Sequence, residues 1–547
     1  MKIKVIFFAL IFLLSCSQRN DRLDGFLYLR LNNNPTTLDP ALIVDVMGGI
    51  ISAKVFNGLV RFGEDLSIIP DIAESWSVSK DHKTYKFKLR KNVTFSNRRE
   101  IDAKDFKYSF ERVLNPKTKS PNTWVFSKIK GAKDFMDGKS PTAQGIRVID
   151  DLTLEITLKE PFAPFLGLLA MTAAYVVPME EVEKWGEDFG MHVSGTGPFI
   201  LEEWRHGRNL KLGAREDYFE GKPKIKGIAY RIIPEDLTAI AEFEAGNLDA
   251  IGIPSAEFRH YTKSPKWKDK VVSYAGMNTY YLGMNCERPP LSDPLLRQAI
   301  SYSIDREKVL KTIYERRGVL AGGPIPPILI PTHPSFVNNP PSPPFRKGGM
   351  GGFEKGGKEL KGYTYDPEKA KELLRKAGYP EGFSIKIYIT ADQQEVLDVV
   401  EAIQHYLGKV GIDAKITQLE WSAYKEAINR GEPDAFWISW WADYPDPENF
   451  LFPLFHSSNW GAGGNRTRFK DEEVDRIIEQ AQREMNQEER YKLYEKAEKR
   501  IIELAPWVFF WHRIDFAMHQ EWVKGYKIYP IYSMDKGMEV EIKRVPE

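Results

Sequence analysis

The sequence predicts a mixed α/β (α+β) protein that is built from several lobes. The chain has 547 residues, which is more than one hydrophobic core normally supports, so two or three lobes are expected. Patterns typical of strands and of helices are mixed along the chain without a strict alternation. Together these observations favour a multi-lobed α/β or α+β architecture.

The first half of the chain contains strand and helix patterns in close succession. Residues 85–89 and 152–158 alternate apolar and polar side chains, as half-buried strands do. Between them, Asp102 is placed to cap a helix that runs through Phe106. Residues 237–245 have the spacing of a further amphipathic helix.

The second half of the chain is predicted to be richer in helices. Asp366 and Pro367 supply a capping side chain and a first-turn proline, and Gly378 is a stop signal for the same helix. Residues 472–504 are highly charged and mainly helical in pattern, with a break expected near Asn486.

The composition is that of an ordinary globular protein. Apolar residues make up 42% and charged residues 28% of the chain. Its net charge of +1 gives no bulk attraction to nucleic acid, so no nucleic-acid partner is expected. The aromatic content of 12% suits either a large apolar cleft or a large aromatic core.

The N-terminus has the pattern of a bacterial lipoprotein signal. Two lysines precede an apolar run at residues 5–14, which is too short to span a membrane. The run ends in Leu-Leu-Ser-Cys, which resembles a lipobox. We therefore expect a signal peptide at 1–15, lipidation of Cys16 and a polar tether at 16–24; the alternative is a plain signal peptide with an incidental cysteine.

Residues 339–361 form an unusual stretch that is rich in proline, glycine and lysine. With almost no apolar side chains, the stretch is predicted to be a disordered surface insertion. It contains a near match to a phosphate-binding loop, but Glu359 stands where a Ser or Thr would bind magnesium. Nucleotide binding is therefore not expected.

Motifs of known catalytic sites are missing from the sequence. There is no HExxH, CxxC or GxSxG motif, and the nine histidines are scattered. If Cys16 is lipidated, Cys286 has no partner within the chain and is expected to be a buried free thiol. We predict no enzymatic activity, no cofactor and no metal ion.

The strongest candidate site follows a predicted buried strand at residues 435–441. The strand ends in an Asp-Tyr-Pro-Asp-Pro turn, whose first residue is Asp443. A carboxylate in that place can pair with an ammonium group through a charge-assisted hydrogen bond. Flanking tryptophans would wall a pocket. The alternative is that the tryptophans belong to the core and Asp443 caps the turn.

Several segments resemble the family 5 extracellular solute-binding proteins of the oligopeptide- and dipeptide-binding type. They stand in the order of that family and cover nearly the whole chain after the tether. The matching segments are residues 37–40, 55–60, 70–90, 102–105, 108–110, 195–199, 246–250, 281–285, 297–300, 305–306, 366–367 and 369–370.

The resemblance implies a periplasmic-binding-protein-like type II fold, with two lobes around a ligand cleft and an extra domain. Its expected parts are lobe I at 25–56, 194–276 and 510–547, accessory domain II at 57–193, and lobe III at 277–509. The lobes of such proteins close over the ligand by a hinge motion.

The resemblance also implies roles for individual residues. Asp443 falls where oligopeptide-binding members hold the peptide's α-ammonium group, and Trp440 and Trp421 fall on positions that line side-chain pockets. Ser439 and Trp441 match positions whose backbone pairs with the ligand.

The resemblance implies one further ligand contact and shows two departures from the family pattern. Val46 matches a backbone contact from the opposite lobe. Trp437 and Val44 stand where oligopeptide binders have charged ligand-contacting residues. The group that would bind the ligand's C-terminal carboxylate is therefore not identified by the resemblance.

The predicted function is that of a substrate-binding protein of an ABC importer, which captures di- or oligopeptides and delivers them to the permease. It would act as a monomer in the periplasm or cell envelope, anchored to a membrane by the lipid on Cys16. The alternative keeps the fold and changes the ligand to a nickel chelate, a sugar or an antibiotic-like molecule. Asp443 argues against an anionic ligand, because a buried carboxylate would repel it.

Overall fold

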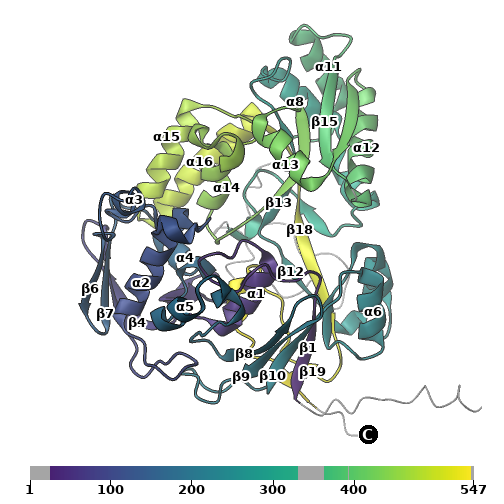
Figure 1. Ribbon diagram of the computed structural model, residues 1–547. Coiled ribbons are helices and arrows are strands. Elements are labelled where there is room, and N and C mark those ends of the chain that lie inside the picture. The colour runs from purple at the N-terminus through teal and green to yellow at the C-terminus, as the bar shows by residue number, and fades with distance from the viewer. Residues whose placement is uncertain (1–24, 330–361, 392, 544–547) are drawn as a thin grey trace, which may run out of the picture.

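An eight-stranded sheet, the large sheet, extends along the right-hand part of the molecule in the view of Figure 1. The structure is a computed structural model and describes residues 25–329, 362–391 and 393–543. The strand order is β11-β18-β13-β17-β15-β16, and β12 and β14 also pair with β18. These strands are β11 (Ala250–Gly252), β12 (Val271–Ala275), β13 (Asn278–Met284), β14 (Gly318–Leu320), β15 (Ser384–Thr390), β16 (Asp413–Leu419), β17 (Ala435–Trp441) and β18 (Trp507–His519).

Another sheet has four strands, which come from distant parts of the chain. Because it contains β1, it is called the first sheet. Its order is β1-β10-β9-β8, and β1 pairs in parallel with β10. Helix α1 packs against this sheet, and Asp45 caps it by accepting a hydrogen bond from the backbone of Gly48. The elements of this part are β1 (Phe26–Leu31), α1 (Val46–Val55), β8 (Phe199–Arg205), β9 (Asn209–Ala214), β10 (Gly227–Ile232), α6 (Asp236–Glu244), α7 (Phe258–Lys263), β19 (Val523–Lys524) and β20 (Glu541–Ile542).

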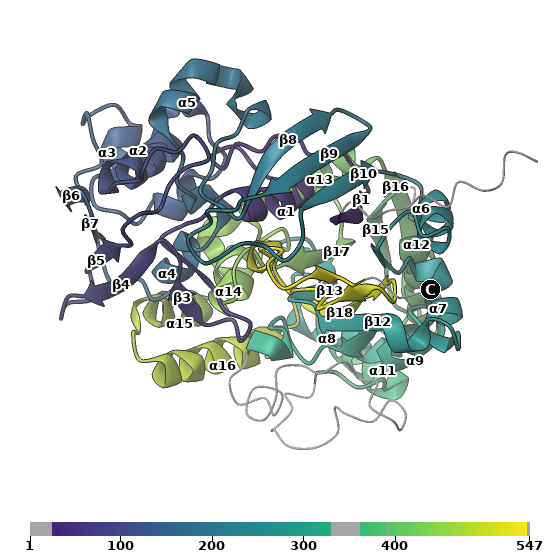
Figure 2. The same cartoon turned by 90° about the horizontal axis from the view of Figure 1, so that it is seen from below.

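The accessory sheet has the order β4-β5-β7-β6 and lies beside α2 and α3 (Figure 2). Asp102 and Asp105 form a reciprocal capping box at the start of α2, which confirms the predicted cap. The elements of this part are β2 (Val60–Phe62), β3 (Ile68–Pro70), β4 (Ala73–Val78), β5 (Thr84–Leu89), α2 (Ala103–Leu114), α3 (Ala132–Met136), β6 (Ile146–Asp150), β7 (Thr153–Thr157), α4 (Phe165–Leu169) and α5 (Met179–Trp185).

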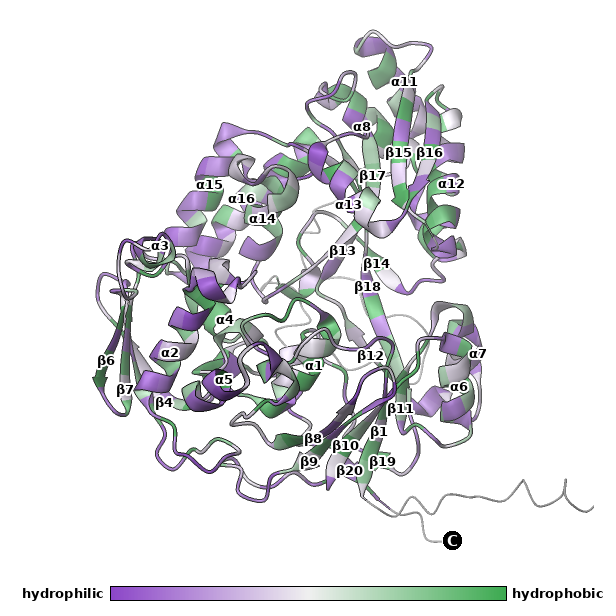
Figure 3. Ribbon diagram, viewed as in Figure 1, coloured by the Kyte–Doolittle hydropathy of each residue, from purple (hydrophilic) through white to green (hydrophobic). Residues whose placement is uncertain are grey.

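Helices cover both faces of the large sheet. One face packs on a core that extends into the accessory sheet and α14–α16, and the other face has a separate core with α8, α11 and α12. Much of α15 and α16 is hydrophilic (Figure 3). These helices are α8 (Pro294–Ser303), α9 (Arg306–Thr312), α11 (Pro367–Lys376), α12 (Gln394–Gly408), α13 (Trp421–Arg430), α14 (Glu448–Phe455), α15 (Glu472–Arg483) and α16 (Gln487–Leu504).

The secondary structure predicted from sequence is confirmed at several places. Strands β5, β7 and β17 and helices α2, α6 and α11 lie where the patterns put them. The predicted break near Asn486 is also present, because this residue caps α16 after α15 has ended. Gly378 follows α11 with a φ of +87°, a conformation that favours glycine.

Strand β18 joins two parts of the molecule. It crosses the predicted boundary between residues 509 and 510 without interruption, and pairs with β13 near its start and with β11 and β12 near its end. The division into two lobes and an accessory domain at the stated residues stays a prediction. The signal peptide, Cys16, the tether and the insertion at 339–361 lie outside the described residues. Within the described ranges, no helix is both long and apolar enough to cross a membrane.

Candidate functional site

Strand β17 leads from the core to the surface. Ala435, Phe436 and Trp437 are buried, the next three residues are half-buried, and Trp441 is 41% exposed. Side chains alternate between the two cores, as they must on a strand with both faces covered. The sequence block that contains the predicted site therefore ends at an accessible edge of the large sheet.

One backbone edge of β17 is free of strand partners beyond its first residues. Its whole length pairs with β13, whereas β15 pairs only with Ala435 and Phe436. On the free side, the hydroxyl of Tyr424 donates to the carbonyl oxygen of Trp437 over 2.6 Å. Because backbone groups of alternate residues point to the same edge, those of Ser439 and Trp441 also point to the free edge. Within the described residues, no other strand occupies that edge.

Asp443 lies just beyond the end of β17. Its backbone N–H donates to Oδ1 of Asn449 over 2.9 Å, and Nδ2 of Asn449 donates to Oδ2 of Asp443 over 3.4 Å. The carboxylate makes no ion pair with any cation in the described part of the chain. Burial by surrounding protein raises its pKa, against the smaller opposing effect of the Asn449 hydrogen bond. The side chain is nevertheless open to solvent, so a cation can reach the carboxylate of Asp443.

Tyr532 and the start of α1 lie near Asp443. Desolvation raises the pKa of Tyr532, and the carboxylates of Asp443 and Asp45 raise it further. Tyr532 also packs directly over Gly49, where any side chain would collide with its ring. Val46, the first residue of α1, is 55% exposed. The structure thus brings Asp443 and the N-terminal end of α1 to one place.

The two tryptophans predicted to line pockets differ in exposure. Trp421 is the first residue of α13 and is 51% exposed, with its ring centroid 6.0 Å from that of Tyr424. Trp440 is half-buried against the core that contains Tyr424, and its indole N–H has no hydrogen-bond partner in the described residues. Trp441 donates from its indole nitrogen to the hydroxyl of Ser439 over 3.3 Å.

For Trp437 the structure shows the alternative that the flanking tryptophans belong to the core: it is 5% exposed and packs on Phe510 and Trp511. One expectation from sequence needs correction. Cys286 is a free thiol, but it is half-buried rather than buried. Desolvation raises the pKa of this thiol to about 11, which disfavours the nucleophilic thiolate form at neutral pH.

Several neighbours of the site were not predicted from sequence. Asn449 orients Asp443, and Arg513 lies with its guanidinium carbon 5.8 Å from the ring of Trp441. Lys425 holds its ammonium group 5.4 Å from the ring of Trp421. Of these three neighbours, only Lys425 could have been found from the sequence, because it lies one helical turn after Trp421.

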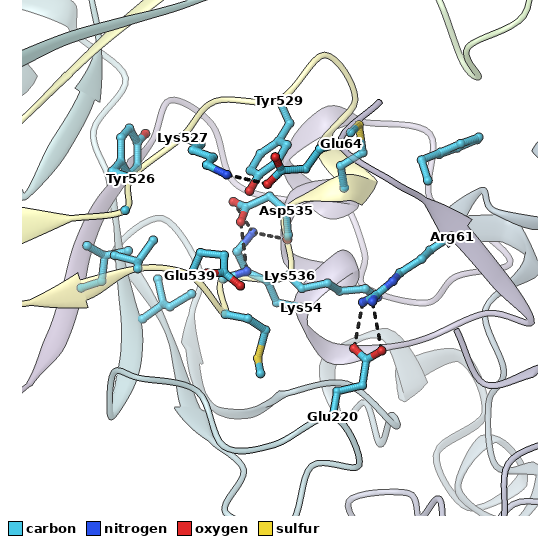
Figure 4. A pocket seen from close by; sticks show the side chains of 18 of the residues that line it. Lys54, Arg61, Glu64, Glu220, Tyr526, Lys527, Tyr529, Asp535, Lys536 and Glu539 are labelled. Atoms are coloured by element: carbon cyan, nitrogen blue, oxygen red, sulfur yellow. Dashed lines mark hydrogen bonds and ion pairs between the residues drawn. The ribbon is translucent and has the colours of Figure 1, made fainter. Parts of the chain in front are cut away.

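A pocket of about 370 Å³ lies elsewhere, between the first sheet and the β2–β3 hairpin. Its charges are paired: Lys54 with Asp535 over 3.0 Å, and Arg61 with Glu220 over 2.8 Å (Figure 4). Lys536 donates to the carbonyl of Phe56 over 2.7 Å. With these groups satisfied by the protein itself, the pocket is held together by ion pairs and offers no unpaired charge to a ligand.

Comparison with known proteins identifies relatives over most of the chain. Residues 67–462 match the sequence profile of the bacterial extracellular solute-binding proteins, family 5. The chain is 31% identical to heme-binding protein A of Haemophilus influenzae, over 93% of this chain and 91% of that protein. It is 29% identical to the dipeptide-binding protein of Escherichia coli, over 88% of each chain.

A solved structure shows the same fold. The periplasmic binding protein DppA of Helicobacter pylori, in complex with the peptide STSA, matches with a TM-score of 0.74 and 27% identity, over 95% of this chain and 98% of that chain. The predicted type II periplasmic-binding-protein fold, with two lobes around a ligand cleft and an extra domain, is thereby confirmed.

Proposed function

Because the chain belongs to the bacterial extracellular solute-binding proteins of family 5, we propose that it captures di- or oligopeptides for an ABC importer. Proteins of this family are transport binding proteins and not enzymes. The observation that carries the peptide assignment is the unpaired carboxylate of Asp443 beside the free edge of β17.

The free edge suits the backbone of an extended peptide. Ser439 and Trp441 can donate and accept the hydrogen bonds that an added strand requires. Backbone pairing holds a peptide whatever its side chains, and this permits one protein to bind many sequences. The ammonium group at the peptide's N-terminus then reaches Asp443, where it forms a charge-assisted hydrogen bond.

The remaining predicted residues supply apolar surface around the ligand. Trp421 and Trp440 wall the spaces for peptide side chains, and Val46 approaches from the other lobe. Exposed tryptophan and valine side chains on both sides would lose contact with water when the lobes close. Ligand-dependent closure needs contacts that form only in the closed state, and these apolar groups provide them.

The protein would work outside the cytoplasm as a monomer, held to a membrane by a lipid on Cys16 after removal of residues 1–15. Residues 16–24 would act as the tether. Replacement of Cys16 by serine should abolish incorporation of labelled fatty acid and release the protein from membranes. Labelling that persists in Cys16→Ser would contradict the anchor.

A second ligand class is favoured by one observation, the 31% identity to a heme-binding protein. A haem or another non-peptide molecule would use the same cleft. Asp443 opposes this alternative, because haem carries carboxylates of its own and an unpaired carboxylate would repel them.

Ligand binding to the full-length protein, purified in detergent, tests the proposal. Thermal unfolding is followed by tryptophan fluorescence with peptides of two to six residues, each with a free or an acetylated N-terminus, and with hemin. A ligand that binds only the folded state raises the unfolding temperature. Free-amine peptides should raise it, and acetylated peptides should not.

The matched variants are Asp443→Asn and Glu401→Gln. Glu401 is exposed on α12, so its replacement removes the same charge away from the cleft. Asp443→Asn should lose the response to free-amine peptides and Glu401→Gln should keep it. A response to hemin with none to any peptide would overturn the peptide assignment and leave the family unchanged.

A further inference from the structure

Two cations near Trp421 have no carboxylate partner. They are Lys425, on α13, and Arg466, in the loop that follows α14. Within residues 25–329, 362–391 and 393–543, neither forms an ion pair. Lys54 and Arg112, by comparison, are each paired with an aspartate.

Arg466 is 7% exposed and bonds only to neutral groups. Its Nε donates to Oδ1 of Asn429 over 3.0 Å, and Nη1 donates to the carbonyl of Gly464 over 3.4 Å. Its third nitrogen, Nη2, has no partner among the described residues. A guanidinium group stays charged in proteins, so its full positive charge remains in this place without compensation.

Lys425 adds a second positive charge to the same surroundings. Its ammonium group lies 5.4 Å from the ring of Trp421 and forms no hydrogen bond within the described chain. Desolvation, and next the charge of Arg466, lower the pKa of Lys425 to about 8. Two like charges that are both partly removed from water raise the free energy of the unliganded protein. An anion placed between them would relieve that cost.

The position of Lys425 and Arg466 relative to β17 indicates which anion they would bind. The free edge begins at Asp443 and ends where Tyr424 takes the carbonyl of Trp437. From Ser439 to Asp443 a strand covers about 13 Å, the length of an extended peptide of about three or four residues. A peptide with its ammonium group at Asp443 therefore runs toward α13. There Trp421 lies with its ring centroid 6.0 Å from that of Tyr424, and the ammonium group of Lys425 lies 5.4 Å from the Trp421 ring.

We propose that Lys425 and Arg466 form an anion subsite that binds a carboxylate of the captured peptide beside Trp421. The inference rests on the proposed peptide-binding function and names the ligand chemistry at the end of the site remote from Asp443. The carboxylate comes either from the C-terminus of a short peptide or from an acidic side chain. Both cationic groups donate hydrogen bonds and neither accepts, as an anion requires.

Three probe peptides separate the two sources of the carboxylate. They are Ala-Ala-Ala with a free C-terminus, Ala-Ala-Ala amide, and Ala-Glu-Ala amide, measured by titration of tryptophan fluorescence in the full-length protein. A hydrogen-bonded charge pair should make at least one of the two carboxylate-bearing peptides bind about 10-fold or more tightly than Ala-Ala-Ala amide. Preference for the free acid assigns the subsite to the C-terminus, and preference for Ala-Glu-Ala amide assigns it to a side chain.

Lys425→Gln removes one charge of the subsite, and Lys415→Gln is the matched control. Lys415 lies on β16 and is 66% exposed, with only a long 3.8 Å contact to Asp413. Lys425→Gln should reduce the carboxylate preference to about 3-fold or less, and Lys415→Gln should leave it intact. Lys425→Glu should reverse the preference, and this reversal would not follow from a loss of packing alone.

The failure of this inference can be distinguished from the failure of the proposed function. Equal binding of all three peptides, still abolished by Asp443→Asn, would overturn the anion subsite and keep the peptide function. A carboxylate preference that survives in Lys425→Gln would also overturn it. If none of the peptides binds, both the function and the subsite are rejected.

Discussion

The hydroxyl of Tyr424 on α13 donates a 2.6 Å hydrogen bond to the backbone carbonyl oxygen of Trp437 on β17. Both groups are buried, and the bond fixes the helix against the strand at the end of the free edge of β17 that is remote from Asp443. It therefore sets the distance between the two ends of the proposed binding site. Asp443 stands at one end, and Trp421 and Lys425 stand at the other.

Replacing Tyr424 by phenylalanine removes this hydrogen bond without removing the ring. The carbonyl of Trp437 would then lie unpaired in the core, so the free energy of unfolding should fall by about 1–3 kcal/mol. Urea unfolding followed by circular dichroism measures the change. Tyr388→Phe is the control, because the Tyr388 hydroxyl makes no hydrogen bond within the described residues. An equal loss in both variants would contradict the assigned role of the bond.

The raised pKa of Asp443 predicts that peptide binding weakens in mild acid. An ammonium group binds the ionised carboxylate, and the surrounding protein favours the neutral form. Affinity for free-amine peptides should therefore fall as the pH decreases through this raised pKa, at a higher pH than for an ordinary aspartate. Dissociation constants measured from about pH 7 to about pH 4 test this dependence.

Asp443→Asn is the control for that titration. Asparagine does not ionise, so the weak binding that remains in this variant should vary little over the same pH range. Circular dichroism at each pH confirms that the protein is still folded. A dissociation constant for the unmodified protein that is constant over this range would show that Asp443 does not hold the ammonium group.

The local patterns in the sequence were sufficient for much of the secondary structure. Asp102, Asp366 and Asn486 each cap a helix where predicted, because a cap is decided by residues within one turn of one another. Gly378 ends α11 for the same local reason. The fold class followed from these patterns and from the resemblance to solute-binding proteins.

The site was harder to predict, because its parts meet only in the folded chain. Trp437 and Trp441 are close in sequence, yet one is in the core and the other is exposed at the end of the strand. Nothing in the spacing reveals where β15 stops pairing with β17. Arg466 approaches Lys425 from a loop about forty residues away, and such long-range proximity has no periodic signal in the sequence.

His512 predicts a loss of stability in acid. It is buried on β18, with Nδ1 positioned to donate to the carbonyl of Asn278 over 2.8 Å, and burial lowers its pKa from 6.5 to about 4. The unfolded chain therefore binds a proton more readily than the folded protein at intermediate pH. Stability contributed by neutral His512 is complete above pH 6.5 and is lost as the pH falls toward 4, by up to roughly 3 kcal/mol.

Replacement by asparagine keeps a donor for Asn278 and removes the titration. The difference in the free energy of unfolding between the unmodified protein and His512→Asn isolates this contribution, and it should shrink as the pH falls from about pH 6.5 to about pH 4. The difference between the unmodified protein and His405→Asn, which changes an exposed side chain of α12, should stay constant over that range. Identical pH profiles for His512→Asn and the unmodified protein would refute the role of His512.

Glu498 predicts the opposite dependence, a loss of stability as the pH rises. Its side chain is 3% exposed on α16 and accepts one hydrogen bond from the backbone of Ile325, over 3.2 Å. Desolvation raises its pKa from 4.5 to about 8, against the smaller opposing effect of that hydrogen bond. The folded protein therefore holds a proton that the unfolded chain releases above pH 4.5, and stability falls as the pH rises through 8, by at most roughly 5 kcal/mol.

Glutamine at this position imitates the protonated acid and can still accept from Ile325. Glu498→Gln should therefore match the unmodified protein near pH 5 and exceed its free energy of unfolding increasingly above pH 7. Glu495→Gln removes an exposed carboxylate from the same helix and should show no such gain. The contributions of His512 and Glu498 offset one another between about pH 4.5 and pH 6.5, so the unmodified protein should be most stable there, and the double variant His512→Asn, Glu498→Gln should have a flatter profile on both sides of that range. A stability maximum that stays equally sharp in the double variant would mean that other groups control the pH dependence.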